Sequence, residues 1–195
     1  MTKAAAGVIT HEVYRRTSLL FWRHTTSYST LLLQVVEASR IPAACVAALA
    51  YWGEDETLHW WMPELERFAR PFAPPSGSDM VLNLPLVAGS TIFYAAGAAA
   101  IAAQRFDLLA KLFDLRGHRI SRQQDASIAE VLRPDGLTNR GTAPHYQEVA
   151  GVVGEALGLG AEPVDDAIQR FDVLRLAAAI MADERLPAGR VLKPV

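Results

Sequence analysis

Apolar residues recur at spacings of three and four along most of this chain, and this pattern predicts an all-α protein. Alternating apolar and polar positions, which are typical of strands, are scarce. Much of the apolar content is Ala, which favours helices because Ala loses no side-chain entropy there. We therefore expect an irregular multi-helix domain built from packed helical hairpins. The clearest apolar stripe lies near the C-terminus and consists of Val164, Ile168, Phe171, Leu174, Ala178 and Met181.

Residues 93–113 give the most specific local prediction, a helical hairpin. A helix of small apolar residues runs up to a polar break at 104–105, and a second, amphipathic helix follows. Asn83 and Pro85 suit the start of the first arm, and Asp107 is expected to cap the second. The apolar face of the second arm must meet a partner helix.

Proline, glycine and capping residues divide the rest of the chain into further predicted helices. Outside them, residues 116–143 are expected to be mostly loop. In the N-terminal part, the predicted helices are 10–22, 29–40, 42–52, which Pro42 opens and Gly53 ends, and one that Asp55 caps and Pro63 kinks or restarts. In the C-terminal part, a short helix is opened by Ser127 and Glu130, and a longer one spans 144–156. The last predicted helix is opened by Pro163 and carries an Asp166–Arg170 pair.

The segment 71–79 is the clearest predicted loop, because three prolines and a Ser-Gly-Ser run cannot support a helix. The length suits a single helical domain, 1–195. An alternative is two lobes, 1–70 and 80–195, joined by a hinge at 71–79.

Charge and cysteine content narrow the classes of partner and compartment. Lys and Arg number 19 against 21 Asp and Glu, so the net charge of −2 offers no basic field for a nucleic acid. Cys45 is the single cysteine, which excludes an internal disulfide and suits a reducing cytoplasm. Residues 84–103 carry no charge, but Pro85 and Gly97 interrupt them, so we expect a buried core helix and no membrane partner.

Few residues in the sequence are spaced as catalytic or metal-binding groups would be. Glu56 and His59 would share one helix face, and His145 and Glu148 repeat the spacing in reverse. Zinc and iron sites need three or four convergent ligands, so neither pair predicts a metal site. No phosphate-binding loop, dinucleotide fingerprint or nucleophile elbow is present in the sequence, and we expect no cofactor.

Large aromatic residues gather between positions 51 and 72. One interpretation is an aromatic core between helices, since such rings dominate core burial. The other is a surface for a partner or ligand, because Trp60 and Trp61 are neighbours on one helix and cannot both face inward. The candidate surface residues are Trp52, His59, Trp60 and Trp61.

The hairpin resembles a tetratricopeptide repeat in its placement of Phe93, Gly97 and Phe113. It departs from that pattern at Ala100, where a Tyr is usual, and at Leu109, where an Ala is usual. No second copy follows at the repeat spacing. The resemblance implies repeat-like helix packing without a repeat array.

A second resemblance rests on residues 48–56, 82–113, 168–184 and 185–191. These runs are similar to a helical region that lies C-terminal to a sirtuin-like NAD-consuming domain or an NTPase in large bacterial proteins. The resemblance implies a regulatory or recognition role in defence against phage. This chain departs from the pattern because it contains no such catalytic domain.

The sequence thus predicts a non-catalytic helical interaction or regulatory module that binds a protein partner or a second copy of itself. The alternative is a small enzyme or ligand-binding protein with a pocket between helical lobes. Glu56, His59 and His145 would be its acid–base groups.

Overall fold

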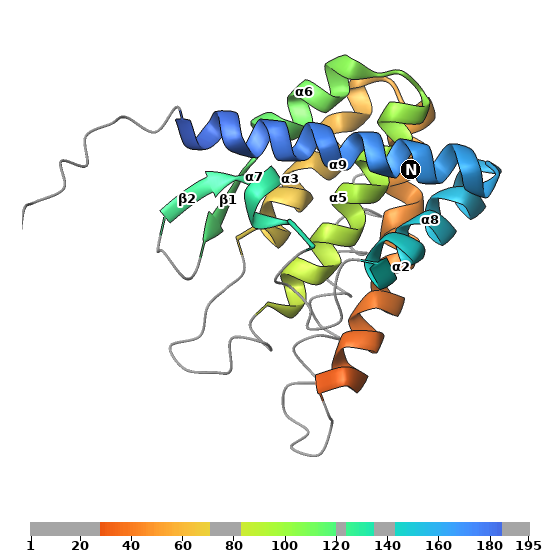
Figure 1. The fold of residues 1–195 in the computed structure, drawn as a ribbon, viewed down its shortest axis with the longest axis horizontal. Coiled ribbons are helices and arrows are strands. Elements are labelled where there is room, and N and C mark those ends of the chain that lie inside the picture. The colour runs from red at the N-terminus through yellow and green to blue at the C-terminus, as the bar shows by residue number, and fades with distance from the viewer. Residues whose placement is uncertain (1–27, 71–82, 120–123, 135–142, 185–195) are drawn as a thin grey trace, which may run out of the picture.

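The computed structural model describes residues 28–70, 83–119, 124–134 and 143–184 (Figure 1). These residues form an all-α fold with one small sheet, as the hydrophobic pattern predicts. The elements are α2 (Tyr28–Trp52), the 3₁₀ helix η1 (Asp55–Thr57), α3 (Leu58–Phe68), α5 (Leu84–Ala102), α6 (Phe106–Asp114), β1 (Arg116–Arg119), β2 (Gln124–Ser127), α7 (Ile128–Val131), α8 (Ala143–Leu157) and α9 (Ala161–Glu184).

Helix α5 is the centre of the fold, with α2, α3, α6, α8 and α9 in contact with it (Figure 1). Every residue from Leu86 to Ile101 is buried. Small residues allow the neighbouring helices to approach closely. A Cβ atom at Gly97 would lie 2.1 Å from the ring of Phe171 on α9, and one at Gly89 would lie 2.7 Å from the Cβ of Phe68 on α3.

Two helices, α2 and α5, are long and apolar enough to cross a membrane by length and composition alone. The most apolar window of α5 is 89% buried inside the protein and that of α2 is 44% buried. The burial of α5 agrees with the predicted central helix. Core helices of soluble proteins meet the same criteria of length and composition.

The predicted start of a helix at Pro42 and the predicted restart at Pro63 are not observed. Pro42 lies inside the continuous helix α2, and Pro63 lies inside α3. A proline within a helix removes one hydrogen bond and crowds the preceding turn, at a cost of about 3 kcal/mol. At Pro42, which is buried, the packing of α2 along α5 offsets that cost. Asp55 does not cap an α-helix either, since it begins η1, and α3 starts only at Leu58.

The predicted hairpin is confirmed as α5 and α6. Gln104 adopts a positive φ of 57° at the turn, and the Arg105 amide donates to the Ala100 carbonyl at 2.8 Å. Asn83 is the N-cap of α5. Asp107 is not the cap of α6, because it lies within the first turn and Arg105 takes the cap position.

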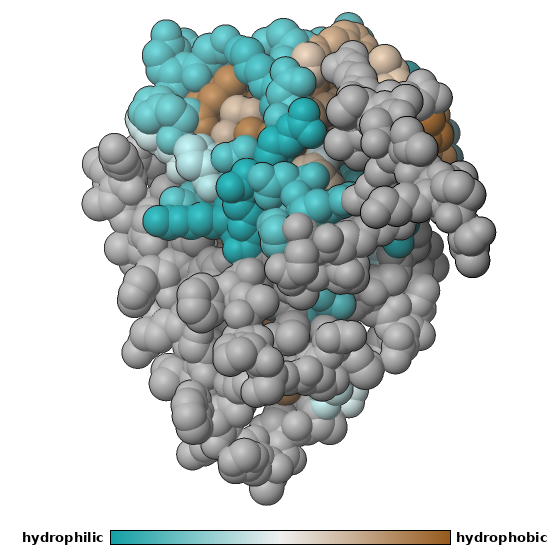
Figure 2. All heavy atoms as spheres, turned by 90° about the vertical axis from the view of Figure 1, so that its left-hand side faces the viewer, coloured by the Kyte–Doolittle hydropathy of each residue, from teal (hydrophilic) through white to brown (hydrophobic). Residues whose placement is uncertain are grey.

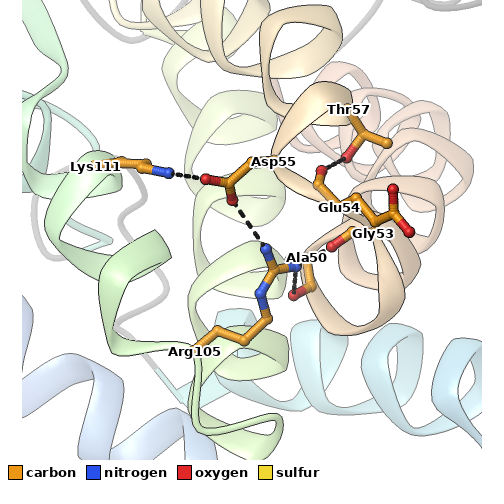
Figure 3. A network of polar contacts seen from close by, with 7 residues as sticks. All are labelled: Ala50, Gly53, Glu54, Asp55, Thr57, Arg105 and Lys111. Carbon is orange, nitrogen blue, oxygen red and sulfur yellow. Dashed lines mark hydrogen bonds and ion pairs between the residues drawn. The ribbon is translucent and has the colours of Figure 1, made fainter.

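The side chain of Arg105 also ties this turn to the C-terminal end of α2 (Figure 3). It donates to the carbonyls of Ala50 and Gly53, and it lies 3.5 Å from Asp55, which Lys111 of α6 also contacts at 2.6 Å. A cation at a helix C-terminus is favourable because the last carbonyls carry partial negative charge. The hydrogen bond from Lys111 lowers the pKa of Asp55 below its ordinary value.

The antiparallel pair β1 and β2 replaces part of the predicted loop. Its strands pair Arg116 with Ser127 and Arg119 with Gln124. Ala126 is the single apolar side chain in the two strands, so they give no alternating pattern from which to predict the sheet. The strands depend on tertiary contact instead, because the His118 amide donates to the carbonyl of Ala69, just after α3, at 2.7 Å.

The short predicted helix after β2 is confirmed as α7. Ser127 is its N-cap and accepts a hydrogen bond from the amide of Ala129. Helix α8 is confirmed as well, and it ends before Gly158, whose φ of 67° suits a glycine.

Residues on both sides of the predicted hinge share one hydrophobic core, to which Leu65 of α3, Phe93 of α5 and Phe171 of α9 all belong. Described residues before and after the predicted hinge therefore contribute to the same core. The hinge 71–79 and the predicted helix 10–22 lie outside the described residues.

The apolar stripe of the last helix is fully buried only along its first half, and in the second half Ala178 is partly buried against the core. Val164, Ile168 and Phe171 are at most 3% exposed. Leu174 and Met181, which the same stripe predicts to be buried, are 39% and 53% exposed. The second half of α9 therefore exposes apolar side chains that the stripe predicts to be buried.

Candidate functional site

The four residues of the predicted aromatic surface differ in position and exposure. Trp52 is 61% exposed at the end of α2, whereas His59 and Trp60 lie on α3, exposed and half-buried respectively. Trp61 is only 3% exposed and belongs to the core, so its prediction as a surface residue is wrong. The physical reason is the helical period, which places Trp61 on the inner face of α3 with Leu58, three residues earlier.

The three candidate acid–base residues differ in their surroundings. Glu56 on η1 and His59 on α3 are exposed. His145 on α8 instead contacts α5, where its Nε2 lies 3.2 Å from the Ser90 hydroxyl and its ring lies 5.4 Å from that of Tyr94. Burial lowers the pKa of His145 to about 4, so the imidazole is neutral at physiological pH.

The residue spaced with His145 in the sequence does not join it. Glu148 accepts a hydrogen bond from Arg40 of α2 at 2.6 Å. Across the described ranges, no group of three or more His, Cys, Asp or Glu side chains is arranged to hold a metal ion.

His145 borders a partly buried polar cluster that the sequence does not predict. At its centre, the Tyr94 hydroxyl of α5 donates a hydrogen bond to the Asp172 carboxylate of α9. Arg175 of α9 donates to the same carboxylate oxygen at 2.8 Å and to the carbonyl of Ala129 on α7 at 3.0 Å. Tyr146 of α8 completes the cluster, with its ring 5.6 Å from that of Tyr94.

The protonation states in this cluster follow from its hydrogen bonds. Burial opposes ionisation of Asp172, but hydrogen bonds from Tyr94 and Arg175 outweigh that effect and hold the pKa of this carboxyl below its ordinary value. Burial and the hydrogen bond to Asp172 raise the pKa of Tyr94. The cluster therefore contains an ion pair between Asp172 and Arg175 and a neutral tyrosine donor.

This cluster fixes the rotation of α9 about its axis. Arg175 is only 7% exposed, and a buried guanidinium is tolerated only where it is paired and hydrogen-bonded. Asp172 and Ala129 provide those partners on the core side of α9. With Arg175 held inward, the opposite side of the helix must face outward.

That opposite side is apolar. Residues 173–182 contain a single charged residue, the inward-pointing Arg175. Val173 is 68% exposed, and Ile180 and Met181 are each 53% exposed. We call the exposed side chains at 173, 174, 176, 177, 180 and 181 the α9 outer face. Its members are Val173, Leu174, Leu176, Ala177, Ile180 and Met181.

A groove of about 820 Å³ adjoins the α9 outer face where α9 passes the ends of α2 and α5. Tyr51, Ile101 and Phe106 line it from α2, α5 and α6, and Val173 and Leu174 line it from α9. Phe106 is itself 62% exposed. The groove and the outer face are thus continuous through Val173 and Leu174.

Another side of the protein differs in character. Figure 2 shows the side of the molecule toward which the C-terminal end of α9 points, and its described surface is largely hydrophilic with smaller hydrophobic areas in the upper part. Single exposed apolar residues are ordinary, whereas several on one helix face mark binding sites.

The sequence could not single out the α9 outer face, because the stripe from Val164 to Met181 is compatible with burial along its whole length. A usable signal was present nonetheless. Residues 173–182 are apolar around the whole helix except at Arg175, whereas a fully amphipathic surface helix carries polar residues on its outer side.

No family model, curated protein or solved structure matches this chain.

Proposed function

We propose that this protein is a non-catalytic helical interaction module, and that the α9 outer face with the adjoining groove is its docking surface. The observation that carries the proposal is the arrangement of residues 173–182, where the one charge points inward and the apolar side chains point outward. Exposed apolar residues that contribute nothing to the core lower solubility, so their grouping on one helix face favours a binding role.

The docking surface has the composition of an interface centre. Interface cores are depleted of charge and rich in large apolar side chains, with polar residues around them. Val173, Ile180 and Met181 supply the apolar side chains. Asp166 and Arg170, which form an ion pair at 2.9 Å on the first half of α9, border the groove.

The size of the native complex tests this proposal. In a lysate of the source cells, the tagged chain should elute in a species larger than its own mass of 21.2 kDa. The double variant Val173→Asp and Ile180→Asp should elute at the mass of the isolated chain, since charge on both residues prevents docking. Glu56→Ala and His59→Ala, both at exposed positions, serve as controls and should elute as the wild type does. A double variant that elutes with the wild-type species contradicts the proposal.

The groove also favours a second candidate, a ligand-binding protein. Its volume of about 820 Å³ lies within the range of small-molecule sites. Apolar side chains line it together with Gln169 and Arg170, which offer hydrogen-bond donors. A thermal shift of the wild type with a metabolite, absent from Leu174→Glu, would support this candidate over protein docking.

The biological setting rests on resemblance alone. Because residues 48–56, 82–113 and 168–184 resemble helical regions of bacterial proteins implicated in phage defence, we propose that the module acts in such a system. Phage plating on bacteria that express the wild type should fall relative to bacteria that express the Val173→Asp and Ile180→Asp variant. Equal plating would contradict this assignment.

A further inference from the structure

The groove beside the α9 outer face is bordered by exposed carboxylates. They lie in the three segments that line the groove or directly after them, at the end of α2, the start of α6 and the start of α9. Within the described part of the chain, none of them pairs with a cation. We call these carboxylates the acidic rim, and its members are Glu54, Glu56, Asp107, Glu162 and Asp165.

Helical spacing places two members of the acidic rim on the groove side of α9. Glu162 lies four residues before Asp166, and Asp165 lies four residues before Gln169. Asp166 and Gln169 both line the groove, and residues four apart share one face of a helix. From α6, Asp107 directly follows a groove-lining phenylalanine.

The cations near the groove are already engaged. Arg170 pairs with Asp166 at 2.9 Å, and Lys111 pairs with Asp55 at 2.6 Å. Figure 3 shows Arg105 directed toward Asp55 and the carbonyls at the end of α2, to which it donates. The acidic rim therefore keeps its negative charge, which attracts a basic partner and repels an acidic one.

Exposed aromatic rings accompany the acidic rim. Phe106 lines the groove and is 62% exposed, and Trp52 at the end of α2 is 61% exposed. Tyr51, which also lines the groove, has its ring 4.9 Å from that of Trp52. Aromatic faces stack with guanidinium groups, and carboxylates accept two parallel hydrogen bonds from them. Rings and carboxylates together suit arginine side chains.

We propose that the docking surface binds a basic, apolar segment of a partner protein. Apolar side chains of that segment contact the α9 outer face and the groove, and its arginine side chains reach the acidic rim. The proposal rests on the proposed function, because it names the chemistry of the partner for the same surface. A second copy of this chain would bring the same acidic rim to the interface and lacks this charge complementarity.

Two labelled peptides test the charge of the partner. Each has about 15 residues with Leu at helical spacings of three and four, and the remaining positions are Arg and Gln in one peptide and Glu and Gln in the other. In fluorescence anisotropy, the full chain should bind the Arg peptide about tenfold more tightly than the Glu peptide. The difference should shrink at high salt, which screens exposed charges. Equal affinities, or tighter binding of the Glu peptide, would overturn the proposal.

Paired Asp→Asn variants locate the effect. Asp107→Asn with Asp165→Asn should weaken binding of the Arg peptide about fivefold, because an exposed charge pair is lost at each position. Asp114→Asn with Asp125→Asn is the matched control, since it changes the net charge equally at exposed positions outside the groove. The control should bind within about twofold of the wild type. Equal weakening by both variants would mean that overall charge attracts the peptide, and would overturn a role for the acidic rim.

Crosslinking inside the groove identifies the occupant. A benzoyl-phenylalanine introduced at Phe106 and irradiated with saturating Arg peptide should form a covalent adduct with the peptide. The yield should fall when Asp107→Asn and Asp165→Asn are added. An adduct with a second copy, or with another segment of the same chain, in place of the peptide would overturn the proposal.

Failure of this inference is distinguishable from failure of the proposed function. If the Arg peptide binds no better than the Glu peptide while the wild type still elutes as a large species in lysate and Val173→Asp with Ile180→Asp does not, the docking surface stands and its partner is not basic. If the lysate experiment fails as well, the docking surface falls.

Discussion

The two halves of α9 place polar and apolar side chains in opposite ways. In the first half, Val164, Ile168 and Phe171 are buried, and the exposed Asp166 and Arg170 form an ion pair on the outside. This is the arrangement that amphipathic helices of globular proteins usually show.

In the second half, Arg175 is buried and Val173, Ile180 and Met181 are exposed. The residues of the two halves therefore have different roles. The first half is explained by folding, since apolar burial drives it. In the second half, the paired Arg175 fixes the helix while the outer apolar residues contribute little to the core, so binding explains them better.

The largest expected effect of a substitution lies in the first half. Phe171 is fully buried, and its ring stacks on that of Phe113 at a centroid distance of 5.7 Å. Phe171→Ala leaves a cavity against α5 and should lower the free energy of unfolding by about 3–5 kcal/mol in urea denaturation. A decrease in the free energy of unfolding below about 1 kcal/mol would contradict the account that burial of the first half of α9 stabilises the fold.

The second prediction concerns pH and the cluster behind the second half. His145 has a folded-state pKa of about 4 against an ordinary value of 6.5, so the unfolded chain binds its proton first as pH falls. The contribution of His145 to stability is therefore present above about pH 6.5 and is lost as pH falls toward 4, with a total on the order of 3 kcal/mol. Asp172 and Tyr94 face the imidazole, and the charge of Asp172 partly opposes the shift.

Urea denaturation between pH 4 and pH 7 measures this effect. His145→Gln should flatten the fall in stability over that interval, because glutamine does not titrate. His59→Gln, at an exposed position on α3, should keep the wild-type slope. A His145→Gln slope equal to that of the wild type would show that the cluster admits a protonated imidazole.

The third prediction compares two arginines of the same helix. Arg175→Met leaves Asp172 without its cation and the carbonyl of Ala129 without its donor, and should cost about 2 kcal/mol of stability. Arg170→Met removes only an exposed ion pair and should change stability by less than about 0.5 kcal/mol. Similar losses from both variants would mean that Arg175 does not fix the rotation of α9.

The smallest expected effect is at the α9 outer face. Ile180→Ala, at a side chain 53% exposed, should change the free energy of unfolding by less than about 0.5 kcal/mol at protein concentrations too low for association. Ile168→Ala is the matched substitution in the first half, where the side chain is 3% exposed, and should cost about 2–4 kcal/mol. Equal costs at the two positions would contradict the division of the helix.

Much of the fold could be predicted from local pattern. The hairpin of α5 and α6, the start of α7 at Ser127 and the end of α8 before Gly158 each follow from residues within one turn of the boundary. Pro42 misled the prediction because its local penalty is offset by the packing of α2 along α5, which a single segment does not reveal. The strands β1 and β2 were not predicted because they depend on a tertiary contact with the segment after α3.

The candidate site depends even more on tertiary structure. Tyr94 and Asp172 are separated by 78 residues, and no sequence spacing predicts their hydrogen bond. The aromatic residues that cluster in the sequence also did not reveal which ring faces the core, and the structure shows that it is Trp61. His145 was recognised as a titratable candidate, but its neutral, buried state could be known only from its contacts with Ser90 and Tyr94.

Photo-crosslinking at Ala177 in the source cells tests the central claim most directly. A benzoyl-phenylalanine introduced at Ala177 lies in the middle of the α9 outer face, and one at Ala161 lies on the same helix outside it, both at exposed positions. The account predicts a covalent adduct, with a second copy or with another protein, from position 177 and none from position 161. Equal crosslinking from both positions, or no adduct from 177, would contradict a docking role for the second half of α9.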